Sequence, residues 1–343
     1  MSKKQKRNSG SPKPVIGITV GDYNGIGPEV ALKSVLKPDI RKICAPVLYG
    51  PLQVYEYYRR KYRLRLRFDP IDHPRLSPES DSLPLINFQE GKHLPITPGK
   101  FTRQSGVIAG TSLALAASDC LAGNIDGIVT SPISKEAIHA AGFRFPGQTE
   151  MLAKLTHSGD VVMMFVSGSI RVALATIHIP VHQVSTNLTK SYLSSKITTV
   201  LSSLRTDFSI RSPKIAVLGL NPHAGEHGAI GKEEQIIIEP VIHRFRNRGI
   251  RIDGPFPADG FWGTNRHREY DLTLAMYHDQ GLIPFKMNHF TTGVNYSAGL
   301  PIVRTSPDHG TAFDIAGSGT ADPTSMIESI RLAASILQRR TPS

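Results

Sequence analysis

The stretch VIGITVGDYNGIGPEVALKSVLK, residues 15–37, decides the fold class. It starts with a short apolar run that is typical of a buried strand, and after a glycine-rich turn it continues with the apolar spacing of a helix. The same order returns in IDGIVTSPISKEAIHAAG, residues 125–142, where the final glycine suits a helix C-terminus. Strands that alternate with helices predict an α/β protein whose mostly parallel sheet is covered by helices.

The chain has 343 residues, of which 40% are hydrophobic and 20% are charged, and this is enough for two globular domains with sizeable cores. The long apolar stretch at residues 161–181 is interrupted by Gly168, Ser169 and Arg171. It therefore predicts two core strands and not a membrane span. Residues 105–122 are rich in small side chains and predict a tightly packed helix. Residues 68–96 are rich in Pro, Asp and Ser and predict an excursion from the main fold.

The first residues, MSKKQKRNSGSPKP, carry charges but no apolar segment, so they do not predict a secretory signal. We predict a disordered basic tail over residues 1–13. Cys44 and Cys120 fit neither a disulfide framework nor a paired-cysteine metal site. Two such cysteines favour a reducing compartment, and we predict a cytoplasmic protein.

The formal net charge of +12 would suit a nucleic-acid-binding protein, but its location argues against one. Eleven cations lie either in the tail or in one segment near residue 63: Lys3, Lys4, Lys6, Arg7, Lys13, Arg59, Arg60, Lys61, Arg63, Arg65 and Arg67. At residues 63–68 the charges alternate with apolar side chains, as in a strand with one face in water. We therefore predict a solvated face, with no nucleic-acid or membrane partner; a surface that follows phosphates is the alternative.

Three histidines share one sequence context, because each follows a short apolar run: IRVALATIH ends at His178, KIAVLGLNPH at His223 and DLTLAMYH at His278. In open α/β sheets, ligands bind outside the carboxyl ends of the strands, so these side chains can meet in one crevice. Three imidazoles would leave open positions on a divalent ion, as catalytic metal sites do. The alternative is that each histidine caps its own strand through hydrogen bonds.

Other loops carry polar residues whose roles stay open. The turn at residues 21–29, GDYNGIGPE, follows a strand and opens a helix, so its backbone N–H groups could face an anion or a cofactor; a plain strand-to-helix turn is the alternative. Asp259 and Asp279 are candidates for a general base, or are simply solvated or capping. Lys286, Asn295 and Arg304 suit a phosphate or carboxylate, or are surface groups.

Several motifs together resemble the 4-hydroxythreonine-4-phosphate dehydrogenases of vitamin B6 biosynthesis. They are GDYNGIGPE, GQTE, ATIHIP, LNPHAGEHG, PAD, MYHDQGLIPFK and RTSPDHGTAFDIAG, and the resemblance runs with gaps from about residue 15 to 334. It implies a fold similar to the isocitrate and isopropylmalate dehydrogenases. On this chain we expect two α/β/α domains, residues 14–141 plus 305–343 and residues 142–304. The active site would lie in the interdomain cleft of a homodimer and use residues of both subunits.

The resemblance also implies roles for single residues. His178, His223 and His278 become ligands of one divalent metal ion, zinc, magnesium or cobalt. Gln148, Thr149, Lys286, Asn295 and Arg304 fall on substrate contacts, and Gly310, Thr311, Ala312 and Asp314 on the site of NAD or NADP. Asp259, Asp279 or solvent would be the catalytic base.

The implied reaction is oxidation of 4-phosphooxy-L-threonine at its C3 hydroxyl, with hydride transfer to NAD or NADP. Loss of CO2 would then give 3-amino-2-oxopropyl phosphate for pyridoxal 5'-phosphate biosynthesis. The chain departs from the family's pattern at Gln148, where a histidine is usual, and at Tyr23 and Asn24, where Pro-Ala is usual. Gln keeps hydrogen-bonding capacity but cannot carry a proton's charge at pH 7.

The resemblance therefore defines the family more closely than the substrate, and three alternatives stay open. The first is a related dehydrogenase of threonate or erythronate 4-phosphate; dihydrodiol dehydrogenases also share the fold, but the phosphate-binding residues favour a phosphorylated four-carbon acid. The second is a three-histidine metal hydrolase, which would need no nicotinamide. The third is a basic nucleic-acid-binding protein.

Overall fold

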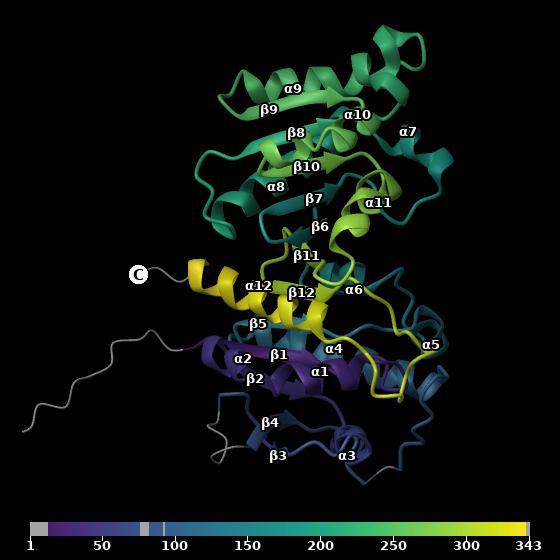
Figure 1. The fold of residues 1–343 in the computed structure, drawn as a ribbon, viewed down its shortest axis with the longest axis vertical. Coiled ribbons are helices and arrows are strands. Elements are labelled where there is room, and N and C mark those ends of the chain that lie inside the picture. Colours follow the sequence, from purple (N-terminus) through teal and green to yellow (C-terminus); the bar gives the residue numbers. More distant parts are fainter. Residues whose placement is uncertain (1–12, 76–81, 92, 341–343) are drawn as a thin grey trace, which may run out of the picture.

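The computed structural model describes residues 13–75, 82–91 and 93–340. One sheet contains all twelve strands of these residues, and helices follow most of them (Figure 1). The strands are β1 Val15–Thr19, β2 Ala45–Tyr49, β3 Arg67–Pro70, β4 Ser82–Ile86, β5 Gly127–Thr130, β6 Val162–Ser167, β7 Ile170–Leu174, β8 Lys214–Leu218, β9 Arg251–Phe256, β10 Leu272–Ala275, β11 Val294–Ala298 and β12 Val303–Pro307.

The strand order is β3-β4-β2-β1-β5-β12-β11-β6-β7-β10-β8-β9. Eight of the eleven pairings are parallel, which confirms the mostly parallel α/β sheet. The antiparallel pairings join β12, β11, β6 and β7 at the centre of the sheet. Two parallel blocks are thus joined through an antiparallel centre. β12 contains residue 304, where we expect a domain boundary; the division into two domains stays a prediction.

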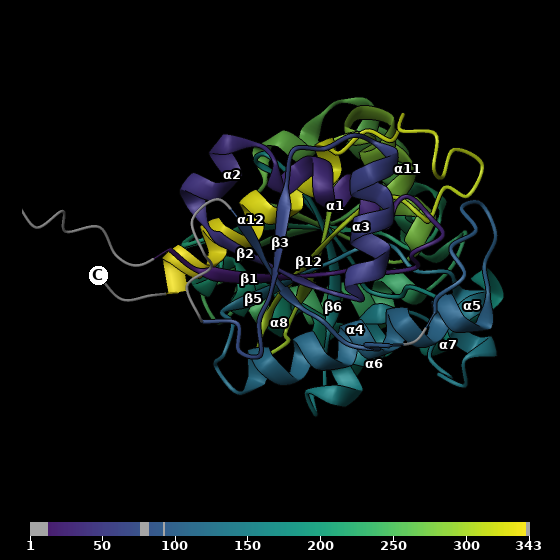
Figure 2. The same cartoon turned by 90° about the horizontal axis from the view of Figure 1, so that it is seen from below.

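Helices cover both faces of the sheet (Figures 1 and 2). They are α1 Gly27–Val35, α2 Pro38–Ile43, α3 Leu52–Lys61, α4 Arg103–Leu121, α5 Lys135–Ala140, α6 Gln148–Leu155, α7 Val184–Asn187, α8 Lys190–Thr206, α9 Glu239–Arg246, α10 Ala258–Gly263, α11 His278–His289 and α12 Thr324–Arg340. Ile16 and Ile18 of β1 are fully buried. Because both faces are covered, such strands are apolar along their whole length, which is the pattern that the sequence showed.

The helices after β5, β7, β9 and β10 gather on one side of the molecule, at the right of Figure 1. These are α5, α7, α10 and α11. Chain segments that are far apart in sequence, from β5 to α11, therefore meet on that side. This arrangement positions the site described below.

Some local predictions need correction. Charged and apolar side chains at residues 63–68 do alternate between solvent and the interior, because Arg63, Arg65 and Arg67 are exposed while Leu66 is buried. The strand, however, begins only at Arg67, since Arg63 has a left-handed backbone (φ 52°). The expected excursion at residues 68–96 contributes β4, which pairs with both β2 and β3.

Other predictions concern the cysteines, membrane spans and the tail. Cys44 and Cys120 are both free and buried. Within the described ranges, no helix is long and apolar enough to cross a membrane. The tail predicted over residues 1–13 lies outside the described residues, apart from Lys13.

Candidate active site

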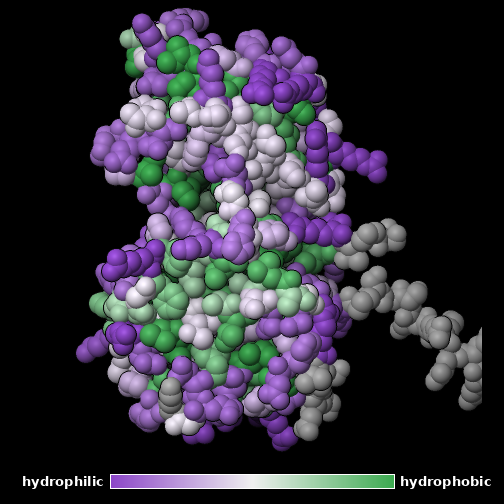
Figure 3. Space-filling view, turned by 180° about the vertical axis from the view of Figure 1, so that it is seen from behind, coloured by the Kyte–Doolittle hydropathy of each residue, from purple (hydrophilic) through white to green (hydrophobic). Residues whose placement is uncertain are grey.

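A cavity of about 280 Å³ lies where α6 and α11 face the strands β5, β6, β11 and β12. We call it the central cavity. In the rear view, the surface is hollowed between the upper and lower parts of the molecule, at the left of Figure 3. Met163 and Phe165 of β6 supply apolar lining, and most of the other lining side chains are polar.

The central cavity gathers many of the residues predicted from the sequence. Gln148, Thr149, His178, His278, Lys286, Asn295, Arg304 and Gly310 line it. The remaining predicted residues, His223, Asp259, Asp279, Thr311, Ala312 and Asp314, are not part of its lining. Among the lining residues that were not predicted, four have ionisable side chains: Lys135, Glu150, Asp308 and His309.

Arg304 is a buried cation without an acidic partner among the described residues. Its side chain on β12 is 2% exposed, and it donates hydrogen bonds to Thr130 Oγ1 (2.7 and 3.1 Å), Ser297 Oγ (3.1 Å) and Thr149 Oγ1 (3.3 Å). Burial lowers the pKa of Arg304 to about 10, and the charge of Glu150 counteracts this, so the guanidinium stays charged at neutral pH. A buried charge is costly unless it is paired, so Arg304 is suited to an anionic ligand.

Lys286 on α11 is held by Asp308, the residue that directly follows β12. Its Nζ lies 2.9 Å from Asp308 Oδ1 and donates to the Asp308 carbonyl at 3.2 Å. Burial raises the pKa of Asp308, and Lys286 counteracts this. Asp308 therefore holds the ammonium group of Lys286, a second cation, in a fixed position at the cavity.

The central cavity contains five of the eleven buried side-chain atoms that have no hydrogen-bond partner in the described residues. They are Gln148 Oε1, Glu150 Oε2, Asn295 Oδ1, Asp308 Oδ2 and His309 Nε2. Gln148 donates its Nε2 to the Ser131 carbonyl (3.1 Å), which leaves its oxygen free. Buried polar groups are normally paired, so these atoms are suited to contacts with a bound ligand or with water. Four of the five are oxygen acceptors, and they suit hydroxyl or ammonium groups.

His178 and His278 meet at one end of the cavity, with ring centroids 6.4 Å apart. His178 Nδ1 lies 3.0 Å from Glu150 Oε1, and His278 Nδ1 lies 2.7 Å from Asp279 Oδ1. Although burial alone would raise it, the hydrogen bond from His178 lowers the pKa of Glu150. When Nδ1 donates to a carboxylate, Nε2 is free to bind a metal, and this pairing is typical of metal-binding histidines. The two rings thus fit a divalent cation.

His223 lies apart from this pair, in the exposed turn η2 Pro222–Gly228. Five successive residues, 223–227, have positive φ angles between 41° and 78°, and only one of them is glycine. Glu234 holds the turn, because its Oε1 accepts from the N–H groups of Leu220 (2.7 Å) and Asn221 (2.8 Å). Such strain costs about 1–3 kcal/mol for each non-glycine residue and is frequent at functional sites.

The metal set predicted from the sequence is therefore gathered only in part. His178 and His278 lie together, whereas His223 is outside the cavity. In residues 13–75, 82–91 and 93–340, no group of three His, Cys, Asp or Glu side chains is placed to hold a metal ion. The two candidate bases differ: Asp279 contacts His278, and Asp259 lies exposed on α10.

One of the predicted cofactor residues, Thr311, lies against the glycine-rich first turn. The Thr311 carbonyl accepts a hydrogen bond from the N–H of Ile26 (2.9 Å), and a side chain at Gly25 would collide with Thr311. Two motifs that are almost 300 residues apart in sequence thus form one surface beside Gly310. This contact was not predicted.

Tyr23 and Asn24, which depart from the family's pattern, connect this turn to residues 95–99. Tyr23 is fully buried and donates to the Pro95 carbonyl (3.2 Å), and Asn24 Oδ1 accepts from the Thr97 N–H (2.8 Å). Burial raises the pKa of the neighbouring Asp22 to about 6, although hydrogen bonds from Asn24 N–H and Ser105 counteract this. Both unusual residues therefore have structural roles.

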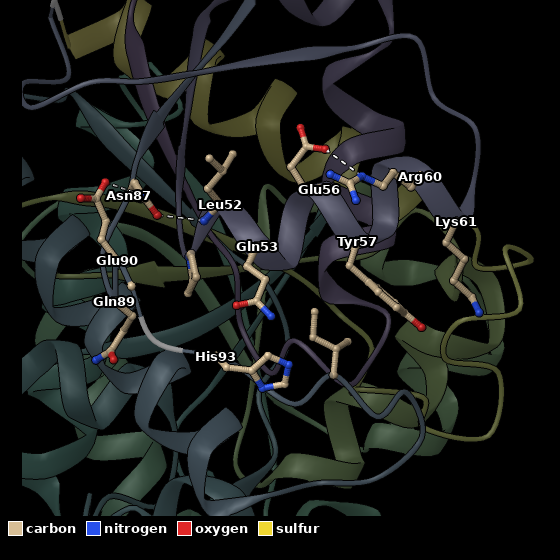
Figure 4. A pocket seen from close by; sticks show the side chains of 13 residues that line it. Leu52, Gln53, Glu56, Tyr57, Arg60, Lys61, Asn87, Gln89, Glu90 and His93 are labelled. Carbon is tan, nitrogen blue, oxygen red and sulfur yellow. Dashed lines mark hydrogen bonds and ion pairs between the residues drawn. The ribbon is translucent and has the colours of Figure 1, made fainter.

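A larger hollow of about 1200 Å³ lies beside α3 (Figure 4). Several of its polar groups are already engaged: Gln53 binds the backbone of Leu94 through two hydrogen bonds, and Asn87 contacts Leu52 N–H and Glu90. Of the buried unpartnered atoms in the described residues, none belongs to a residue that lines it. Size alone therefore does not make it the candidate site.

Comparisons with known proteins show the family of the chain. Residues 42–333 match the family model described as pyridoxal phosphate biosynthetic protein PdxA. A 4-hydroxythreonine-4-phosphate dehydrogenase of Prosthecochloris aestuarii is 42% identical over 330 residues, which cover 94% of this chain and 97% of that protein.

Solved structures give the same picture. The crystal structure of 4-hydroxythreonine-4-phosphate dehydrogenase from Klebsiella pneumoniae has a TM-score of 0.85 and 37% identity, covering 96% of this chain and all of that chain. A terephthalate 1,2-cis-dihydrodiol dehydrogenase from Burkholderia xenovorans is more distant, with a TM-score of 0.62 and 28% identity over 94% of this chain and 98% of that chain.

Proposed function

Because the chain belongs to the PdxA family of pyridoxal phosphate biosynthetic proteins, we propose that it is a 4-hydroxythreonine-4-phosphate dehydrogenase. It would oxidise the C3 hydroxyl of 4-phosphooxy-L-threonine and then release CO2 to give 3-amino-2-oxopropyl phosphate. The observation that carries this proposal is the buried Arg304, which forms no ion pair with a carboxylate of the described residues and lies beside unpartnered oxygen acceptors. This combination suits a ligand with both anionic groups and hydrogen-bond donors.

In this proposal, the side chains of the central cavity bind and orient the substrate. Arg304 and Lys286 bind its anionic groups, since a guanidinium can grip two oxygens and an ammonium adds a point charge. Gln148, Asn295 and Thr149 bind its hydroxyl and amino groups. Met163 and Phe165 exclude water from one side of the cavity.

We propose that His178 and His278 bind a divalent metal ion together with His223 of the partner subunit. Glu150 and Asp279 would orient the two rings, and the third ligand must come from elsewhere, because His223 of the same chain is not in the cavity. Zinc, magnesium or cobalt held there would supply Lewis-acid polarisation of the substrate's oxygens.

The proposal includes a homodimer, for which exposed apolar residues are the support. Ile283, Met287 and Phe290 are 58%, 80% and 67% exposed and are spaced as on one helix face. Val181, close in sequence to His178, is 75% exposed. Such side chains beside His278 and His178 suit contact with a second copy of the chain.

We further propose that NAD or NADP binds along the surface that the first turn shares with Gly310, Thr311, Ala312 and Asp314, and accepts the hydride there. The contact between Thr311 and Ile26 supports this placement. The catalytic base would be Asp279, which already contacts His278, or Asp259. Because α10 packs on η2, a subunit that supplies His223 to the site of its partner would bring its Asp259 close to that site as well. The free cysteines favour the cytoplasm as the compartment.

A second candidate substrate is threonate or erythronate 4-phosphate, because Gln148 departs from the family's pattern at a lining position. The purified protein, loaded with a divalent metal, tests both candidates in a panel of the three phosphorylated acids, with reduction of NAD and of NADP as the readout. We expect the highest kcat/KM for 4-phosphooxy-L-threonine. Preference for another acid would replace the substrate, and a lack of nicotinamide reduction with every acid would contradict the dehydrogenase and favour the metal hydrolase.

A further inference from the structure

A second cavity, of about 670 Å³, lies at the amino ends of β7 and β10, where Ile170 and Asp271 line it. We call it the basic cavity, because Arg171, His267, Arg268 and His289 line it together. It is separate from the central cavity, with which it shares no lining residue.

Arg171 provides a half-buried guanidinium with spare donors. One of its terminal nitrogens donates to the carbonyls of Ser169 (2.9 Å) and Asp271 (3.2 Å), and its plane lies over the ring of Phe208 (4.6 Å). Its Nε is buried without a hydrogen-bond partner, and it forms no ion pair within the described part of the chain. Burial lowers the pKa of Arg171 and the charge of Asp271 offsets this only in part, so a bound anion would further stabilise the guanidinium.

His267 gives a second unpartnered nitrogen in the same cavity. Its side chain is 9% exposed, its ring packs on Trp262 with centroids 5.0 Å apart, and its Nδ1 is buried without a partner. His289, at the end of α11, packs on Phe285 (5.3 Å). Burial lowers the pKa of both imidazoles, and the charge of Arg268 lowers them further, so both are neutral at pH 7 in the free protein.

The acidic residues of the basic cavity are already engaged. Asp271 Oδ2 accepts from the backbone N–H of Lys214 (2.7 Å), and its carbonyl accepts from Arg171. Glu269 is paired with Arg266 (4.0 Å) at the exposed rim. The groups left without partners are therefore nitrogens, and in this respect the basic cavity differs from the central cavity.

We propose that the basic cavity binds a compact anion of the phosphate or sulfate class, such as the phosphoryl group of a phosphate monoester. Arg171 and Arg268 would grip its oxygens from two sides, as guanidinium forks do. His267 and His289 would donate further hydrogen bonds once protonated. The binding itself does not depend on the proposed dehydrogenase activity.

Calorimetric titration of the full chain with inorganic phosphate tests the proposal. We expect two binding events, one in each cavity. In Arg268→Gln the event of the basic cavity should weaken by about tenfold, because a charge-assisted hydrogen bond is lost. His267→Asn should weaken the same event, whereas Arg205→Gln, at an exposed position of α8, should change neither. Arg304→Gln, or Lys286→Gln if that protein does not fold, should remove only the event of the central cavity.

The outcomes separate this proposal from the proposed function. If Arg304→Gln and Lys286→Gln abolish all phosphate binding, or if Arg268→Gln and His267→Asn bind as the wild type does, the basic cavity is not an anion site, and the dehydrogenase proposal is unaffected. If the wild type shows a single phosphate-binding event and Arg268→Gln loses it, the proposal for the basic cavity is supported and the phosphate subsite of the central cavity is contradicted.

Sulfate sharpens the test, because its charge is constant near neutral pH. The charged groups that face His267 and His289 are Arg171 of β7, Arg268 and Glu269 of η4 Arg266–Glu269, and Asp271. Since a bound anion raises the pKa of each imidazole, sulfate should bind about tenfold more tightly near pH 6 than near pH 8. Sulfate affinity that is independent of pH in the wild type would contradict the role of the imidazoles.

Discussion

The central cavity and the basic cavity lie at the two ends of one helix, since His278 begins α11 and His289 ends it. Each contains an arginine that forms no ion pair in the described residues, fully buried in the central cavity and half-buried in the basic cavity, but the unpartnered atoms of the two cavities differ. The central cavity contains four unpartnered oxygen acceptors and one imidazole nitrogen, whereas the unpartnered atoms of the basic cavity are all nitrogens.

This difference separates two kinds of ligand. A bare anion satisfies the basic cavity but would leave the acceptors of the central cavity without partners, and a buried unpaired acceptor costs about 1–3 kcal/mol. The central cavity therefore requires a ligand that carries hydroxyl or ammonium donors as well as charge. The predictions below test this contrast, beginning with the largest expected effect.

Loss of a metal ligand should have the largest effect, and only in the central cavity. His178→Ala and His223→Ala should each abolish turnover and lower metal content, while phosphate binding in the basic cavity persists. Metal analysis, steady-state kinetics and calorimetry measure the three properties. Stoichiometric metal and ordinary turnover in His223→Ala would rule out its role.

A mixture of these two variants tests whether His223 comes from the partner subunit. In a mixed dimer, one site carries both substitutions and the other carries neither. Random assembly of equal amounts should therefore restore about one quarter of the wild-type activity. A mixture that stays inactive, although mass spectrometry shows mixed dimers, would place all three ligands in one chain.

Arg304→Gln should reduce kcat/KM for the phosphorylated substrate by about 150- to 5000-fold, because removing one member of a buried charged contact costs about 3–5 kcal/mol. Arg304→Lys should recover part of this loss, since the charge stays and the two-oxygen grip is lost. Circular dichroism checks that both proteins fold. A loss below about fivefold in Arg304→Gln would show that Arg304 is structural.

Asp308→Asn should have a smaller effect, because Asp308 acts through Lys286. Without the 2.9 Å ion pair the ammonium of Lys286 gains freedom, and we expect KM to rise about tenfold with little change in kcat. A matched control is Asp39→Asn, at an exposed ion pair with Arg331, which should leave both constants unchanged. A fall in kcat with unchanged KM would assign Asp308 a part in the chemical step.

The sequence predicted one cavity and missed the other for physical reasons. His178 and His278 follow neighbouring parallel strands, β7 and β10, so their meeting could be inferred from apolar runs alone. Glu150 and Asp308 act through burial and through contacts across the fold. In the sequence, the only signal for them is that they lie in the motifs GQTE and RTSPDHGTAFDIAG. His267, Arg268 and His289 follow no strand end, and Arg171 was visible only as a break in an apolar stretch.

Gln148→His should have the smallest effect. Whether it tightens or weakens substrate binding shows whether position 148 accepts a hydrogen bond from the substrate or faces its anionic group. Gln148 now presents its Oε1 to the central cavity, because its Nε2 is engaged with the Ser131 carbonyl. A protonated histidine would instead donate a charge-assisted hydrogen bond to an anionic group, worth on the order of 1 kcal/mol more, or about a fivefold lower Kd. The gain should fade as pH rises through the pKa of the new imidazole, because the neutral ring loses its charge. Calorimetry with 4-phosphooxy-L-threonine between about pH 6 and pH 8 measures it. If Gln148→His instead weakens binding at every pH, the free oxygen of Gln148 accepts from a substrate donor, and the phosphoryl group binds at Arg304 and Lys286 alone.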